Sequence, residues 1–183
     1  TRGLALATPA RSAKARWGFS RTAVRSATSW AAWRSGRKFR RKPVKSVKLF
    51  SDGSCLGNPG AGGWAYILQY GDAIKKASGA EAMTTNNQME LTAAIMGLSA
   101  LKQPCRVELF TDSEYVVKAI NSWLAKWVVT DFKGKKNADL WRRYLAAAAP
   151  HEIKASWVKG HAGHPQNEEC DAMARAAAEA IKG

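Results

Sequence analysis

The chain changes character near residue 47, where hydrophobic residues begin to recur at regular intervals. Residues 47–52 form a short apolar run closed by Gly53, which predicts a strand. Residues 62–70 alternate, which places four large side chains on one face: Trp64, Tyr66, Leu68 and Tyr70. A turn signal at residues 71–72 leads into a weaker run over residues 73–81. The pattern predicts an antiparallel meander of three strands.

A helical period replaces the strand period after residue 84. Residues 85–88 (TNNQ) fit the capping box of a helix N-terminus, and apolar residues follow at positions 91, 94, 95, 98 and 101. This spacing predicts one amphipathic helix over residues 89–102. Residues 105–111 read as a fourth strand. Because a helix connects it to the meander, a right-handed crossover should lay it parallel to the first strand.

The last third of the chain continues with helices and one more strand. Residues 113–127 and 137–148 are predicted to be helical, with a basic, glycine-broken loop at 128–136 between them. Residues 151–159 alternate as a fifth strand, with Ile153, Ala155 and Trp157 on one face. Pro165 opens a final helix, whose spacing predicts burial of Cys170, Met173, Ala174, Ala177 and Ile181. The order predicts an α/β fold: a five-stranded mixed sheet, three antiparallel strands then two parallel, flanked by helices.

Residues 1–45 are strongly basic and show no regular hydrophobic period. They hold 13 of the chain's 29 basic residues and none of its 14 acids, so a cationic arm precedes a nearly neutral body. The arm is rich in Arg, Ala and Ser without a sustained period, and it cannot bury enough apolar area to offset the entropy of ordering its backbone. We therefore expect a disordered basic arm at 1–45 and one folded domain at 46–183.

Several interpretations of the arm stay open. Its acid-free, Arg- and Ser-rich composition matches an organelle transit peptide. Three tryptophans, at positions 17, 30 and 33, together with the basic cluster at 37–42, could instead grip phosphates and stack on bases without sequence preference. A chain that starts with Thr1 also fits a fragment or a misplaced gene start. The sequence does not decide among these interpretations.

Cysteine usage and hydropathy exclude other classes of protein. Cys55, Cys105 and Cys170 are odd in number and far apart, which argues against a disulfide scaffold or zinc finger and favours a reducing compartment. No apolar run approaches the roughly 20 residues of a membrane span. We expect a cytoplasmic protein, or an organellar one if residues 1–45 are a transit peptide.

Four acidic residues lie at the ends of predicted elements. Asp52 is expected to end the first strand and Asp112 to end the fourth, and because these strands are parallel neighbours about 4.8 Å apart, both carboxylates should emerge at one edge. Glu90 and Asp171 lie in the first turns of two helices. Each acid could simply cap a helix or end a strand at the surface, since acids favour helix N-termini. Accidental convergence of all four is the weaker explanation.

Carboxylates packed together repel one another, because each raises the pKa of its neighbours, unless a cation neutralises them. Oxygen ligands without imidazole or thiolate favour Mg²⁺, with Mn²⁺ as a substitute, over zinc. Such a cluster suits two-metal phosphoryl transfer, with ions about 3.5 to 4 Å apart. The sequence therefore predicts a divalent-metal site formed by Asp52, Glu90, Asp112 and Asp171.

Five strings in the chain resemble those of bacterial-type ribonuclease H, type 1. They are FSDGSCLGNPGAGGWA (50–65), TTNNQMELTAAI (84–95), FTDSEYV (110–116), NADLW (137–141) and WVKGHAGHPQNEECDAMARAAA (157–178). The resemblance runs in order from about residue 47 to residue 178, and all three cysteines fall where bacterial members commonly carry them. It implies the same mixed five-stranded fold.

The resemblance also implies an activity: Mg²⁺-dependent endonucleolytic cleavage of the RNA strand in an RNA–DNA hybrid, leaving 5′-phosphate and 3′-hydroxyl ends. Asp52, Glu90, Asp112 and Asp171 match the family's metal-binding acidic set. His161 matches its catalytic histidine, and with glycines at 160 and 163 around it this side chain should be mobile and able to move protons near neutral pH. His164 is expected to be only a loop residue next to Pro165.

Substrate contacts are implied at two places. Residues that match the family's 2′-hydroxyl-sensing positions are Cys55, Asn58, Asn86, Asn87 and Glu114, the last a Gln in many relatives. Asn86 could instead cap the helix, and Cys55 could be a small buried filler. The DNA strand should follow an aromatic and basic stretch: Trp123, Lys126, Trp127, Lys133, Lys135 and Lys136.

This stretch departs from the family pattern. It is several residues shorter than in relatives with a full basic protrusion, and Val128 and Val129 replace residues that are often Lys. We expect unchanged fold and chemistry but weaker hybrid binding. Trp123 and Trp127 could also simply pack against a neighbouring helix.

Two rival functions share parts of this evidence. A non-catalytic ribonuclease-H-like module would bind hybrids or RNA without cutting, but it would not need the full acidic set and the histidine. An integrase or junction resolvase would share carboxylates at strand ends but not the GSCLGNPG and KGHAGHPQNE strings together. The expected partner is an RNA–DNA hybrid duplex, with no membrane, no obligate protein partner and a monomeric state.

Overall fold

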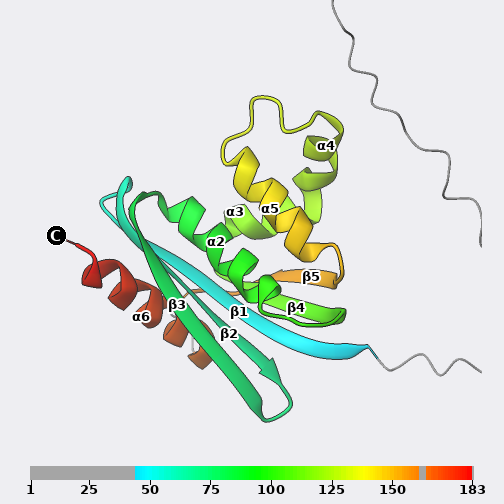
Figure 1. The fold of residues 1–183 in the computed structure, drawn as a ribbon, viewed down its shortest axis with the longest axis horizontal. Helices are drawn as coiled ribbons and strands as arrows, with labels where there is room; N and C mark the ends of the chain where they lie inside the picture. Colours follow the sequence, from blue (N-terminus) through cyan, green and yellow to red (C-terminus); the bar gives the residue numbers. More distant parts are fainter. Residues whose placement is uncertain (1–43, 161–163, 183) are drawn as a thin grey trace, which may run out of the picture. The chain divides into compact units, whose positions relative to one another are not determined.

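A five-stranded mixed sheet forms the centre of the computed structural model, which describes residues 44–160 and 164–182. The strands are β1 (Lys45–Leu56), β2 (Gly60–Tyr70), β3 (Ala73–Thr84), β4 (Cys105–Thr111) and β5 (Glu152–Trp157). Their order in the sheet is β3-β2-β1-β4-β5 (Figure 1). Strands β1, β2 and β3 pair antiparallel, and β4 pairs parallel with both β1 and β5. The predicted fold class is confirmed.

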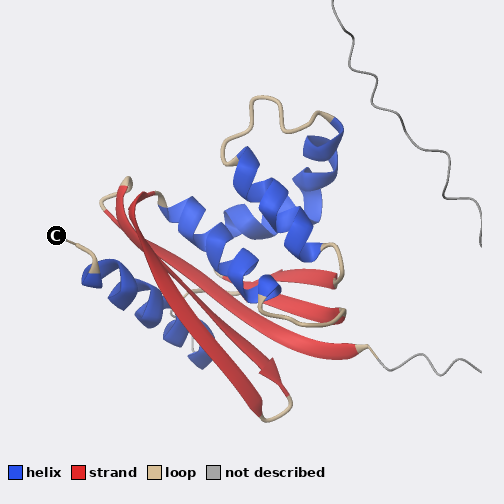
Figure 2. Cartoon of the chain, viewed as in Figure 1, coloured by secondary structure: helices blue, strands red, loops and turns tan. Residues whose placement is uncertain are grey.

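Helices cover both faces of this sheet (Figure 2). One face carries α2 (Asn86–Ser99), α3 (Glu114–Lys118), the π-helical turn η1 (Ala119–Trp123), α4 (Leu124–Val129) and α5 (Ala138–Ala148); the other carries α6 (Pro165–Ala180). The alternation in β2 supplies both cores. Tyr66 and Leu68 join the larger cluster under α2 and α5, while Ala65 and Ile67 pack against α6. Within the described residues, no helix is long and apolar enough to cross a membrane.

Strand β1 is longer than predicted, so Asp52 does not end it. Its parallel pairing with β4 stops at Phe50 and Phe110, whereas its antiparallel pairing with β2 continues to Leu56. The prediction was wrong because the partner, not the local sequence, sets where this strand ends. Asp52 therefore lies inside β1, just past the point where its parallel neighbour turns away into α3.

Gly53 serves close packing instead of the predicted turn. It continues β1 opposite Trp64, and a Cβ atom on it would lie 2.1 Å from the backbone nitrogen of Glu90. Only a residue without a side chain allows the first turns of α2 to approach β1 this closely. The approach brings Glu90 beside Asp52.

The helix predicted over residues 113–127 is continuous but irregular. Ser113 caps α3, its hydroxyl accepting the N–H of Val116 at 3.3 Å, and the π-helical turn η1 leads into α4. An extra residue in such a turn changes which side chains face the core. Trp123 is thereby left 37% exposed, while Leu124 is buried.

One burial prediction needs correction. In α6 the buried stripe is Asn167, Cys170, Ala174 and Ala178, whereas Ile181 is exposed because the helix ends before it. In β5 Ile153 and Ala155 join the core, whereas Trp157 is 49% exposed. The indole N–H of Trp157 donates to the backbone oxygen of Asp112 at 2.9 Å.

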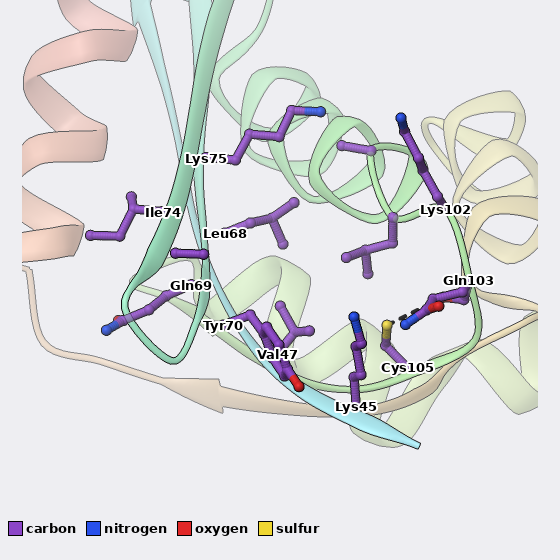
Figure 3. A pocket seen from close by; sticks show the side chains of 13 residues that line it. Lys45, Val47, Leu68, Gln69, Tyr70, Ile74, Lys75, Lys102, Gln103 and Cys105 are labelled. Carbon is purple, nitrogen blue, oxygen red and sulfur yellow. Dashed lines mark hydrogen bonds between the residues drawn. The ribbon is translucent and has the colours of Figure 1, made fainter. Parts of the chain in front are cut away.

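A pocket of about 430 Å³ opens at the opposite end of the sheet from the acidic residues. It lies between the start of β1, the β2–β3 turn and the end of α2, with an apolar floor and lysines at its rim (Figure 3). Glu90 lies in the first turns of α2, whereas the pocket is lined by residues that follow the last turn of that helix. The pocket therefore contains none of the four predicted metal ligands.

Candidate active site

The acidic residues come from four elements that meet at one end of the sheet. Asp52 lies in β1, Glu90 in α2, Asp112 directly after β4, and Asp171 in α6 on the opposite face. Asp52 is only 6% exposed, and the other three are half-buried. Residues far apart in sequence thus gather around a carboxylate that is shielded from water.

Burial, and then the negative charges of Asp112, Asp171 and Glu90, together raise the pKa of Asp52 to about 8. The N–H of Gly53, which donates to Oδ1 of Asp52 at 2.7 Å, acts in the opposite direction but does not compensate. A carboxylic acid that is largely protonated near neutral pH is the expected state when like charges share a desolvated site without a cation. All four carboxylates therefore occupy one electrostatic neighbourhood.

Glu90 is held at both oxygens by neutral donors. Asn86 Nδ2 donates to Oε1 at 2.8 Å, and the Ser113 hydroxyl donates to Oε2. Burial and the charge of Asp112 raise the pKa of Glu90, the two hydrogen bonds lower it, and the net result is a pKa of about 7. The carboxylate is thereby oriented before any ion binds.

Asp112 lies against the chain that follows β5. A Cβ atom on Gly160 would lie 2.7 Å from Oδ2 of Asp112. A side chain at position 160 would therefore push the Asp112 carboxylate away from this position. His161 itself lies outside the described residues.

Asp171 is the acid with a cationic partner. Nη2 of Arg175, one turn further along α6, donates to both of its oxygens at 3.0 and 2.8 Å. Its charge nevertheless reaches Asp52, because it contributes to the raised pKa of that group.

The donor set fits a divalent cation by type, since four carboxylates and no imidazole or thiolate suit Mg²⁺ or Mn²⁺. In their present rotamers, however, no three His, Cys, Asp or Glu side chains of the described residues form a group that could hold a metal. The hydrogen bonds at Glu90 and the ion pair at Asp171 engage oxygens that an ion would need.

The predicted 2′-hydroxyl-sensing residues meet beside Glu90, except for Glu114. Asn58 Oδ1 accepts the backbone N–H of Asn86 at 3.1 Å, which ties the loop after β1 to the start of α2. Thr85, not Asn86, caps that helix, with its N–H donating to Gln88 Oε1 at 2.9 Å. Cys55 is half-buried with its thiol 3.3 Å from the carbonyl of Thr84, and Asn87 is exposed. Glu114 lies in the first turn of α3 and pairs with Lys118.

The aromatic and basic stretch forms a separate surface on η1, α4 and the following loop. The ring centres of Trp127 and the buried Trp141 are 5.7 Å apart, so the predicted packing of Trp127 against a helix is confirmed. The ring centre of Trp123 lies 5.6 Å from that of Trp127. Lys135 Nζ lies 5.5 Å from the Trp127 ring centre. The remaining predicted cations, Lys126, Lys133 and Lys136, are exposed.

The sequence analysis missed two residues that shape the site, Ser113 and Arg175, and it named Gly160 only for the mobility of His161. The spacing of Arg175 from Asp171, four residues on one helix, was a readable signal. Ser113 follows Asp112 directly, but its bond to Glu90 depends on how α2 packs against α3 and has no signature in the sequence.

Comparison with known proteins gives consistent results. The family model described as RNase H matches residues 44–179. A "Ribonuclease H" of Campylobacter concisus is 69% identical over 139 residues, covering 76% of this chain and 96% of that protein. A "Ribonuclease HI" of Campylobacter jejuni is 58% identical over 135 residues, covering 74% and 92%. A solved structure described as LC9-RNase H1, a type 1 RNase H with the type 2 active-site motif, is 31% identical with a TM-score of 0.70, covering 76% and 74%.

Asp52→Asn should change how stability depends on pH in the metal-free protein. Because burial and like charges raise the pKa of Asp52 from an ordinary 3.8 to about 8, the folded protein binds a proton that the unfolded chain releases. Stability from this group is present below pH 4 and is lost as pH rises towards 8. Between pH 5 and 8 the free energy of unfolding of the parent should fall by on the order of 2 to 4 kcal/mol because of this group, and the variant should not show that fall. Urea denaturation in EDTA at both pH values measures it, and parallel profiles for both proteins would contradict the assignment.

Proposed function

Because the chain belongs to the ribonuclease H family, we propose that it cleaves the RNA strand of RNA–DNA hybrids with the help of divalent metal ions, leaving 5′-phosphate and 3′-hydroxyl ends. Family membership and relatives named ribonuclease H support the hydrolysis. The observation that carries the metal requirement is the buried Asp52, whose pKa is raised by burial and by Asp112, Asp171 and Glu90 together. Such a group is stable as an anion only when a cation shares its site.

The acidic residues Asp52, Glu90, Asp112 and Asp171 are the groups that would hold Mg²⁺ or Mn²⁺. Bound ions would lower the pKa of a water molecule and neutralise charge on the phosphate during hydrolysis. The protein contributes orientation: Ser113 and Asn86 fix Glu90, and Gly53 lets the backbone of α2 approach β1 closely. Both contributions reduce the reorganisation that the reaction needs.

Recognition of RNA belongs to the loop after β1 and the start of α2. Asn58, Asn86 and Asn87 carry amides that can donate to and accept from a 2′-hydroxyl, the group that separates RNA from DNA. Because Asn86 also donates to Glu90, the surface that senses the ribose is directly connected to a metal ligand. Cys55 lies at the end of β1 just before this loop, and Glu114 in α3 is the remaining candidate for a ribose contact.

His161 is proposed to move protons during product release or water activation, on the strength of the resemblance alone. An ordinary histidine pKa near 6.5 suits this role. A His161→Ala protein whose pH–rate profile matched the parent's would remove it from the mechanism.

The proposed working unit is a monomer acting in the cytoplasm, with residues 46–183 as the catalytic domain. Residues 1–43 lie outside the described part of the chain, and Lys45 already belongs to β1. If the arm binds nucleic acid, it does so through charge.

Asp112→Asn should abolish cleavage while leaving hybrid binding measurable, because the amide keeps the shape of the side chain and removes one anionic ligand. A labelled RNA–DNA duplex, with single-stranded RNA and duplex DNA as controls, is incubated with and without Mg²⁺. Glu108→Gln is the matched control, since it makes the same chemical change on the same strand but away from the acidic cluster. Substantial Mg²⁺-dependent cleavage by Asp112→Asn would exclude this residue from the site. A parent protein that binds hybrids and never cuts them would be a binding module.

Replacing Lys133, Lys135 and Lys136 together by Gln should weaken hybrid binding at low salt with little change in turnover of bound substrate. Each lost phosphate contact should reduce the slope of log K against log salt by roughly 0.7 to 0.9. Fluorescence anisotropy over a salt series measures the slope. The control, Lys75→Gln and Lys102→Gln combined, alters exposed lysines at the pocket on the opposite end. Equal slopes for parent and triple variant would place the DNA strand elsewhere.

A further inference from the structure

Arg175 contacts both carboxylate oxygens of Asp171 through a single nitrogen atom. A single nitrogen, Nη2, lies 3.0 Å from Oδ1 and 2.8 Å from Oδ2. The preferred arrangement of arginine on a carboxylate uses two nitrogens in parallel. Here one cationic group contacts both oxygens of a carboxylate that would hold a metal ion.

The other acids of the cluster are held differently. Asp52 accepts from the N–H of Gly53, and Glu90 accepts from Asn86 and Ser113, all neutral donors. Across residues 44–160 and 164–182, the ion pairs reach none of Asp52, Glu90 and Asp112. Arg175 therefore supplies the cationic charge that is in direct contact with the acidic set.

The ion pair between Arg175 and Asp171 can be broken at little cost to the fold. The Arg175 side chain is 53% exposed, so it can leave without uncovering a core, and exposed pairs four residues apart on a helix are weak. Asp171 is less exposed, at 22%, and its charge acts on Asp52. Helix α6 is anchored through other residues, with Cys170 and Ala174 fully buried.

We propose that Arg175 is a positioning residue that occupies Asp171 in the metal-free protein and competes with the divalent ion for it. The inference rests on the proposed function, because it takes the acidic set as the metal site. Arg175 reduces repulsion among the carboxylates when no ion is bound, and it raises the metal concentration that the site needs. It thereby sets the affinity of the site without being a ligand.

The test is direct metal binding without nucleic acid. Titration calorimetry with MnCl₂ at low salt should show Arg175→Gln binding Mn²⁺ about 3- to 10-fold more tightly than the parent, with the difference shrinking as salt increases. Lys76→Gln is the matched control: it also removes one positive charge, from a pair with Glu169 on the same helix, without touching Asp171. Its Mn²⁺ affinity should equal the parent's. Equal affinities for all three proteins, or equal tightening in both variants, would overturn the proposal.

Thermal unfolding provides a second measurement that a purely structural role would not reproduce. Arg175→Gln should melt below the parent in EDTA, because the carboxylates lose their counter-ion, and the gap should close at saturating Mn²⁺. A gap that is the same with and without metal would mark Arg175 as an ordinary surface pair. If the parent itself neither binds Mn²⁺ nor cuts hybrids, the proposed function fails as well. If the parent does both while Arg175→Gln binds as the parent does, only this inference fails.

Discussion

The carboxylate of Asp52 is buried among three other acidic side chains, and the surrounding structure is organised around that unfavourable placement. Removing an acid from water and surrounding it with like charge favours its protonated form, so burial and its neighbours raise its pKa to about 8. The fold tolerates this because the cost is local, while the two hydrophobic cores on either side of the sheet hold β1, α2 and α6 in place. A site that is strained when empty and relaxed when a cation binds is suited to a metal-dependent enzyme.

One glycine and a set of neutral donors make this crowding possible. Gly53 allows α2 to lie against β1, and the Asp112 carboxylate lies against Gly160 in the chain after β5. Asn86 and Ser113 then orient Glu90 without adding charge. Backbone packing thus brings the acids together, and hydrogen bonds from uncharged groups decide where their oxygens point. Because backbone packing and side-chain orientation are set separately, the four acids share one electrostatic field although the present rotamers of the described residues do not form a metal-ligating group.

The sequence could predict the order of elements and the sheet, because strand and helix periods are local properties of the chain. It could also predict which four acids meet, once β4 was expected to lie parallel to β1. It could not predict that β1 extends to Leu56, because the extension depends on pairing with β2 after β4 has turned away. Ile181 was placed in the core by its spacing alone, but α6 ends before it. The engagement of Asp171 by Arg175 depends on rotamers, which periodicity does not encode.

The separation between the acidic cluster and the apolar pocket fits an enzyme that acts on a long duplex. A small substrate is usually held in a concave, mostly apolar cavity, and here such a cavity contains none of the acidic residues. A duplex instead needs an exposed surface with contacts spaced along its length, and the chain supplies two: the amide-rich loop and helix start beside Glu90, and the aromatic and basic stretch on α4 and the loop after it. The first surface contacts Glu90 through Asn86, whereas the second is anchored to the core through Trp127 and Trp141. The two surfaces are therefore held by different parts of the fold, so a change in the basic stretch need not disturb the acidic cluster.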